Sequence, residues 1–327
     1  MIIQVGNIGL QLDILGNTSL ELEREIRNTF SGFNSQSAAW DASLKIFVLP
    51  EIHLDSILLD EETAALKHML ERMEKRFPYA KFPYEWVTGV HRNGSNNARR
   101  PKTLPRPFIS SSHMDRFSVV PLRQCLLALN HDDRQAFALV RGRDISVLNS
   151  AVTIAVQATL CMLAPGKKSV ILHGASVEMG GEGYLFVGVS GSGKSTLAKC
   201  FPSENVFSDE STLCYMSHGT PYLAPTPFIQ TENGHSRPEP APLGRIFFLN
   251  KDNGNSMTDL SPGAAMARIL HNHIHLFSFF RNEEAVGAFH MVDGMVRSAP
   301  ASILNFTRTF DPLPFFEETA YEKQKTL

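Results

Sequence analysis

The chain has 327 residues, of which 43% are hydrophobic and 20% charged, and its formal net charge is −2 at pH 7. This composition is that of a globular protein with one large or two moderate domains, and it excludes a chain-wide basic field of the kind that attracts nucleic acid. The scattered cysteines lack a C-x-x-C pair and favour buried thiols in a reducing compartment. Since residues 1–16 also lack the basic segment of a secretory signal, we expect a cytoplasmic protein.

The first half of the chain predicts strands and helices but carries no recognised motif. Residues 10–15 alternate as in a strand, and residues 18–33 follow the pattern of an amphipathic helix. Residues 61–77 predict a second helix, because acids come early and bases late, as the helix dipole favours. Residues 136–149 predict a hairpin that turns at Gly142. Together these elements predict an α+β arrangement.

An apolar segment follows and is predicted to be a helix over residues 150–164. Its longest apolar run, 151–164, is short for a bilayer and contains Thr and Gln, so no membrane segment is expected. We place the domain boundary here, which gives an N-terminal domain over residues 1–150 and a second domain over residues 151–327.

The second half predicts a mixed sheet with few helices. Strand-like apolar runs and one capped helix pattern, which opens with Ser261 and Pro262, follow one another. The predicted elements are strands at 168–179, 184–189, 205–215, 244–250 and 302–310, and a helix at 261–274. This alternation is typical of an α/β fold.

The sequence GVSGSGKST, residues 188–196, fits the pattern G-x-x-x-x-G-K-[ST] between a predicted strand and a predicted short helix. Glycines let a backbone close around an anion, the lysine reaches the β- and γ-phosphates, and the serine hydroxyl ligates Mg²⁺. We call residues 188–196 the phosphate loop. The predicted cofactor-binding residues are Gly188, Ser190, Gly191, Ser192, Gly193, Lys194, Ser195 and Thr196.

Two well-known classes with this loop do not fit the rest of the chain. An ATP-binding cassette needs an LSGGQ-like signature and a later apolar strand ending in Asp-Glu, and neither follows the loop. A GTPase needs an NKxD base reader, whereas Asp252 directly follows Lys251 in LNKDN. The one Asp-Glu pair after the loop, Asp209-Glu210, follows it closely enough for a short helix and a strand to return the pair to the phosphates.

Residues 172–211, from LHGASVEM through the phosphate loop to FSDES, resemble the kinase domain of HPr kinase/phosphorylase and the nucleotide site of ATP-dependent phosphoenolpyruvate carboxykinase. The resemblance implies a mixed-sheet P-loop fold of that type. It implies that Lys194 holds phosphates, that Asp209 acts on the acceptor proton and the metal, and that His173 lies near the phosphates. Ser195, Asp209 and Glu210 are then the Mg²⁺ ligands, although the resembled enzymes carry Asp where this chain has Glu210.

The resemblance predicts an ATP- and Mg²⁺-dependent kinase that phosphorylates a hydroxyl, most simply a serine of a protein or small peptide, as in relatives that tailor peptides. The acceptor signature of HPr kinase and the oxaloacetate residues of the carboxykinase are both missing. A non-catalytic ATP-binding regulatory or assembly module therefore stays an alternative, as does a carboxykinase-like enzyme of small molecules. Residues 1–150 would recognise the acceptor. Donor identity (ATP, GTP or pyrophosphate) and a homo-oligomeric state stay open.

Three further segments each allow two interpretations. The HNHIH segment places His271 and His275 on one face of a helix, which suits either the helix dipole or a metal. The basic segment 91–102 suits a solvated loop or an acidic partner. The Pro-rich segment 226–245 is a candidate acceptor loop, and its Arg237 and Arg245 either neutralise phosphate or form structural salt bridges.

Overall fold

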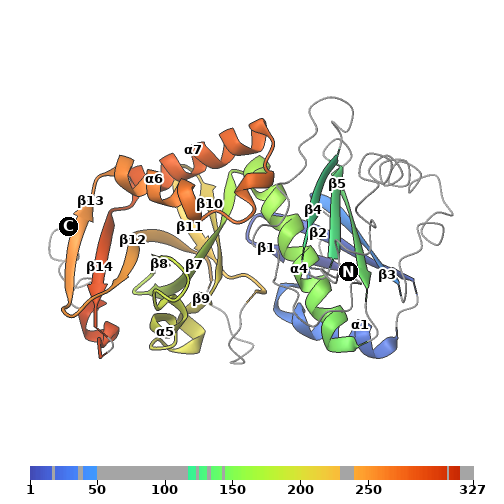
Figure 1. Ribbon diagram of the computed structural model, residues 1–327, viewed down its shortest axis with the longest axis horizontal. Helices are drawn as coiled ribbons and strands as arrows, with labels where there is room; N and C mark the ends of the chain where they lie inside the picture. The colour runs from blue at the N-terminus through green and yellow to red at the C-terminus, as the bar shows by residue number, and fades with distance from the viewer. Residues whose placement is uncertain are drawn as a thin grey trace, which may run out of the picture. The chain divides into compact units, whose positions relative to one another are not determined.

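A computed structural model gives the fold of the chain (Figure 1). It describes residues 1–16, 19–35, 40–49, 117–122, 125–130, 134–141, 144–228, 239–307 and 309–316. The predicted helix at 61–77, the basic segment 91–102 and Arg237 lie outside the described residues. The chain divides into two compact units, Met1–Ile3 with Gly9–Leu160, and Gln4–Ile8 with Cys161–Leu327. This division and the predicted boundary after residue 150 both fall within one helix.

The first unit is built on a mixed six-stranded sheet in the order β1-β2-β3-β6-β5-β4. The pairs β2–β3 and β3–β6 are parallel, whereas β6–β5 and β5–β4 are antiparallel. Its strands are β1 (Ile2–Val5), β2 (Ile8–Gly16), β3 (Ala42–Leu49), β4 (Phe117–Pro121), β5 (Cys125–Asn130) and β6 (Gln135–Arg141).

Two helices of the first unit show how local sequence sets their ends. Helix α1 (Leu20–Thr29) begins where the Ser19 side chain accepts a hydrogen bond from the Leu22 N–H, and it buries Leu22 and Ile26 one turn apart. Helix α4 (Ile145–Leu163) begins after Asp144, whose carboxylate accepts the backbone N–H groups of the first turn.

The start of α4 corrects the hairpin predicted at residues 136–149. Strand β6 pairs with β5, which precedes it, and the chain then enters the helix rather than a returning strand. The Asp144 cap decides this, because it satisfies the first N–H groups of a helix that continues into an apolar run. The helical stretch Ile145–Lys167 is also longer than predicted.

By length and composition alone, Ile145–Lys167 is the one described helical stretch that would suffice to cross a membrane, and 61% of its most apolar window is buried. Mostly buried core helices of soluble proteins meet the same criteria.

The second unit holds a mixed eight-stranded sheet in the order β11-β10-β7-β8-β12-β14-β13, with β9 paired to β7. Strand β12 runs parallel to both β8 and β14, and the other described pairings are antiparallel. The strands are β7 (Ser169–Met179), β8 (Glu182–Val187), β9 (Val206–Ser208), β10 (Ser211–Ser217), β11 (Thr220–Ala224), β12 (Ala241–Lys251), β13 (Ser256–Leu260) and β14 (Ala301–Phe306).

The helices of the second unit lie on opposite sides of its sheet (Figure 1). The short helix α5 (Lys194–Ala198) belongs to an aromatic core that includes Phe186, Phe247 and Phe316. Helices α6 (Pro262–Asn272) and α7 (Asn282–Ser298) lie on the other side, where Phe248 contacts the end of α6. Neighbouring residues of β12 point to opposite faces of the sheet, and this alternation separates the two layers.

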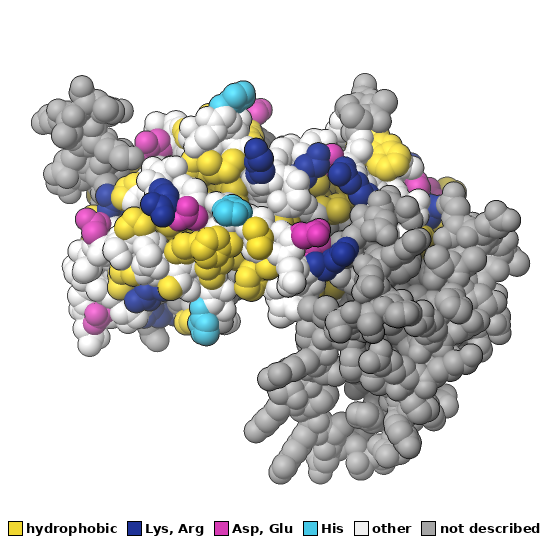
Figure 2. Space-filling model, turned by 90° about the horizontal axis from the view of Figure 1, so that it is seen from above, with side chains coloured by type: hydrophobic (Ala, Val, Ile, Leu, Met, Phe, Trp, Pro, Cys, Tyr) yellow, Lys and Arg dark blue, Asp and Glu magenta, His cyan; other side chains and the backbone are white. Residues whose placement is uncertain are grey.

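Apolar and charged side chains are interspersed on the surface seen in Figure 2. Among the exposed apolar side chains of the second unit are Val286 and Phe289 of α7.

Candidate functional site

The phosphate loop connects the end of β8 to helix α5, as the motif requires. Gly191 and Gly193 have φ angles of 80° and 103°, in the left-handed region that favours glycine. A Cβ on Gly193 would lie 2.9 Å from the Phe306 ring, and one on Gly188 would lie 2.5 Å from the Ser192 Oγ atom. The geometry therefore explains each of the three glycines.

Lys194 is folded back over its own loop. Its Nζ atom donates hydrogen bonds to the Gly188 carbonyl at 2.8 Å and to the Val189 carbonyl at 3.2 Å, and only 6% of the residue is exposed. Burial lowers the pKa of Lys194, and the nearby Glu210 carboxylate opposes this shift. The phosphate loop therefore holds a buried cation whose hydrogen-bond partners are neutral carbonyls.

The turn that carries the acidic pair is tied to the phosphate loop and to β7. The Ser195 Oγ–H donates to the Asp209 carbonyl at 3.2 Å, and the Gly174 N–H donates to the Glu210 carbonyl at 2.9 Å. Asp209 is 2% exposed. The chain thus brings the two carboxylate-bearing residues back to the first turn of α5, as their spacing predicts.

His173 lies opposite Ser211, the residue that follows the acidic pair, in the β7–β10 pairing. Burial lowers its pKa, the Lys194 charge lowers it further, and Glu210 raises it. These opposed effects place His173 within electrostatic range of both Lys194 and Glu210. The predicted catalytic and metal residues therefore lie near one another, and Ser195 is exposed, as are Ser190, Gly191 and Thr196.

The residues present fit a magnesium nucleotide in chemical type. The described residues contain no group of three or more His, Cys, Asp or Glu placed to hold a metal by themselves. Mg²⁺ in nucleotide sites is commonly held by one or two carboxylates together with phosphate oxygens and water, so Ser195, Asp209 and Glu210 suit a metal that arrives with phosphates.

The HNHIH segment differs from its prediction. Helix α6 ends at Asn272, so His273 and His275 lie in the turn that follows it, where Ile274 forms an isolated bridge to Leu172 of β7. The His275 ring lies edge-on to that of His173, with ring centroids 5.4 Å apart.

His275 also contacts the strand that follows the acidic pair. Its Nε2 atom lies 3.1 Å from the Ser211 Oγ atom. The sequence prediction did not connect this histidine with Asp209 and Glu210.

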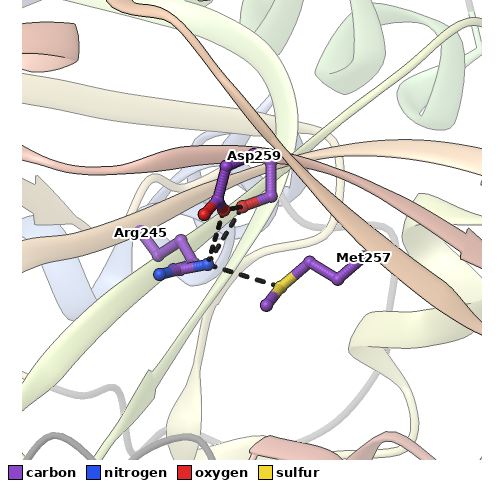
Figure 3. Close-up of polar contacts among 4 residues, drawn as sticks. Arg245, Met257 and Asp259 are labelled. Atoms are coloured by element: carbon purple, nitrogen blue, oxygen red, sulfur yellow. Dashed lines mark hydrogen bonds and ion pairs between the residues drawn. The ribbon is translucent and has the colours of Figure 1, made fainter.

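Of the two roles considered for Arg245, phosphate neutralisation and a structural salt bridge, the structure shows the salt bridge. Its guanidinium donates to the Ser302 hydroxyl at 3.0 Å and pairs with Asp259 at 3.4 Å, and Met257 lies beside it (Figure 3). These contacts connect β12 to β14 and β13, so the Arg245 guanidinium stabilises the sheet.

The two sheets define a mixed α/β protein, as the sequence predicts. No described protein family and no curated protein matches the chain. Among solved structures, it matches the HPr(Ser) kinase/phosphatase from Coxiella burnetii with a TM-score of 0.28 and 10% identity, over 48% of this chain and 96% of that one. Because similarity at this level does not establish a shared fold, the proposals below rest on the residues described above.

Proposed function

We propose that the second unit binds Mg·ATP at the phosphate loop and transfers the γ-phosphate to a hydroxyl, namely that of a serine on a protein or small peptide. The observation that carries this proposal is that the predicted site residues come together at the loop. The Ser195 hydroxyl donates to the Asp209 carbonyl, and the Glu210 charge raises the pKa of both Lys194 and His173. The resemblance of residues 172–211 to HPr kinase adds the choice of reaction.

Each residue has a role in this reaction. Lys194 exchanges its carbonyl partners for β- and γ-phosphate oxygens, and Ser195, Asp209 and Glu210 are the residues that would hold Mg²⁺. When bound there, Mg²⁺ would neutralise the charge that develops on the phosphate. Asp209 accepts the serine proton while the serine oxygen bonds to the γ-phosphorus and the bond to the β–γ bridging oxygen breaks, releasing ADP. The first unit would recognise the acceptor.

One observation favours the second candidate, an ATP-binding module that transfers nothing. Asp209 is almost fully buried, so an acceptor hydroxyl reaches it only if the turn opens. A module needs the nucleotide contacts but not an accessible base.

The deciding experiment uses the full chain with labelled ATP, Mg²⁺ and a panel of serine-bearing peptides and proteins. Mass spectrometry should find a phosphorylated serine, and ADP should form in equal amount. If ATP binds and changes the amide hydrogen-exchange pattern of the protein, but no phosphate is transferred to any acceptor, the module would be favoured. Absence of nucleotide binding would contradict both candidates.

A further inference from the structure

Two buried side-chain polar atoms in the described part of the chain have no hydrogen-bond partner: the Ser192 Oγ atom and the His273 Nδ1 atom. Leaving a buried polar group unsatisfied is costly in free energy, so native proteins rarely keep one without a use. Ser192 belongs to the phosphate loop, whereas His273 lies far away in the sequence.

Backbone pairing brings His273 to β7. The His173 N–H donates to the His273 carbonyl at 2.7 Å, and the His275 N–H donates to the Ile171 carbonyl at 3.0 Å. Leu172 and Ile274 form the bridge between these contacts. The position of His273 beside His173 is therefore fixed by backbone hydrogen bonds.

Strand pairing then relates His273 to the start of the phosphate loop. The His273 ring centroid lies 6.3 Å from that of Phe248, and Phe248 is paired with Val187, the residue before Gly188. The other unpartnered atom, Ser192 Oγ, lies against Gly188 itself. Ser192 Oγ thus lies at the first glycine of the loop, and His273 packs against a residue of β12 whose backbone pairs with the last residue of β8 before the loop.

The electrostatic surroundings of His273 agree with this position. Burial, and to a smaller extent the charges of Lys194, His173 and His271, lower its pKa to about 4. The imidazole is therefore neutral at pH 7, with one ring nitrogen able to donate and the other able to accept. Only 7% of His273 is exposed, so solvent does not readily supply the missing partner.

We propose that His273 is a further ligand-binding residue of this site, whose Nδ1–H donates a hydrogen bond to an oxygen of a phosphate group held in the loop. Ser192 Oγ–H supplies a second donor to the same group. This inference rests on the proposed nucleotide site and adds to it a binding residue from the segment after α6. Lys194 remains the charged contact, and His273 adds a directional neutral one.

The test measures dissociation constants of the full chain for Mg·ATP, Mg·ADP and magnesium pyrophosphate by calorimetry. The variants are His273→Ala, His273→Gln and His273→Asn, because the Asn amide reaches the position of Nδ1 whereas the Gln amide reaches that of Nε2. His271→Ala is the matched control, since His271 is an exposed histidine in the last turn of α6, two residues before His273. Thermal unfolding establishes that each variant folds.

We expect His273→Ala and His273→Gln to weaken all three probes by about tenfold or more, as for a lost hydrogen bond to a charged group. His273→Asn should stay within about threefold of the wild type, and His271→Ala should match it. Equal affinities for the wild type, His273→Ala and His273→Gln would overturn the inference. So would a loss confined to ATP and ADP, because the contact would then be to the nucleoside.

Failure of this inference is distinguishable from failure of the proposed function. If the wild type binds the probes and Lys194→Ala does not, the phosphate site stands, and unchanged binding by the His273 variants removes only the histidine. If the wild type binds none of the probes, both are overturned. If His273→Ala fails to fold, the difference between the Asn and Gln variants decides.

Discussion

Lys194 is a buried cation and Arg245 a partly buried cation of the second unit, and they are compensated in different ways. Arg245 holds the Asp259 carboxylate and the Ser302 hydroxyl across three strands (Figure 3). The hydrogen-bond partners of Lys194 are two backbone carbonyls of its own loop, which carry no formal charge. Arg245 is therefore paired with a carboxylate, whereas Lys194 is bound by the dipoles of two carbonyl groups.

The difference teaches which cation is available to a ligand. An arginine paired with a carboxylate already has its counter-charge, and a bound phosphate would have to displace it. A lysine held by carbonyls keeps its charge for an incoming anion, at the cost of the lowered pKa that burial imposes. We therefore assign phosphate binding to Lys194 and sheet stability to Arg245, and each prediction below tests or refines this contrast.

The largest effect is expected from Lys194→Ala. Removing the only side-chain cation that we assign to the phosphates should lower phosphate transfer by at least about 10²-fold and weaken Mg·ATP binding. Calorimetry and a transfer assay measure the two effects. Lys199→Ala, an exposed lysine at the end of the same helix, should leave both unchanged. Equal ATP affinity and activity in Lys194→Ala and the wild type would reject the phosphate loop.

Asp209→Asn separates a base from a metal ligand. If Asp209 accepts the acceptor proton, the variant should keep much of its Mg·ATP affinity and lose at least about 10²-fold in transfer, because general-base catalysis acts in the transition state. Single-turnover transfer with labelled ATP measures the rate. Transfer at the wild-type rate would show that another group takes the proton.

Glu210→Gln should act through the metal. Losing one charged ligand should raise the Mg²⁺ concentration required for half-maximal nucleotide binding by about tenfold. Titration with Mg²⁺ at fixed ATP measures this shift. Because Glu210 also opposes the lowered pKa of Lys194, an unchanged Mg²⁺ requirement with weakened ATP binding would assign it to the lysine instead.

The smallest effect is expected from Arg245→Met, which keeps an apolar stem but removes the guanidinium. Because Asp259 is largely exposed and solvent can replace its partner, the loss of stability should be about 1 kcal/mol. Thermal unfolding measures it, and Mg·ATP affinity should be unchanged. A clear loss of ATP affinity in a folded Arg245→Met variant would contradict the contrast between the two cations.

Patterns within short segments predicted much of the second unit. The strand before the phosphate loop, the short helix after it and the helix that opens with Ser261 and Pro262 all occur near their predicted residues. The return of Asp209 and Glu210 to the loop also followed from spacing. In the first unit, the predicted hairpin at residues 136–149 was wrong, because the apolar run after Asp144 continues a helix.

The sequence by itself determined the phosphate loop and the acidic pair, because their residues are close in the chain and the turn, the strand and the short helix between them have few alternative arrangements. Only the tertiary structure decided that His273 lies beside His173, that Phe306 closes over Gly193 and that Arg245 is paired with Asp259. Each of these contacts joins segments that are distant in sequence, and strand pairing and side-chain packing, which local patterns do not encode, set their register.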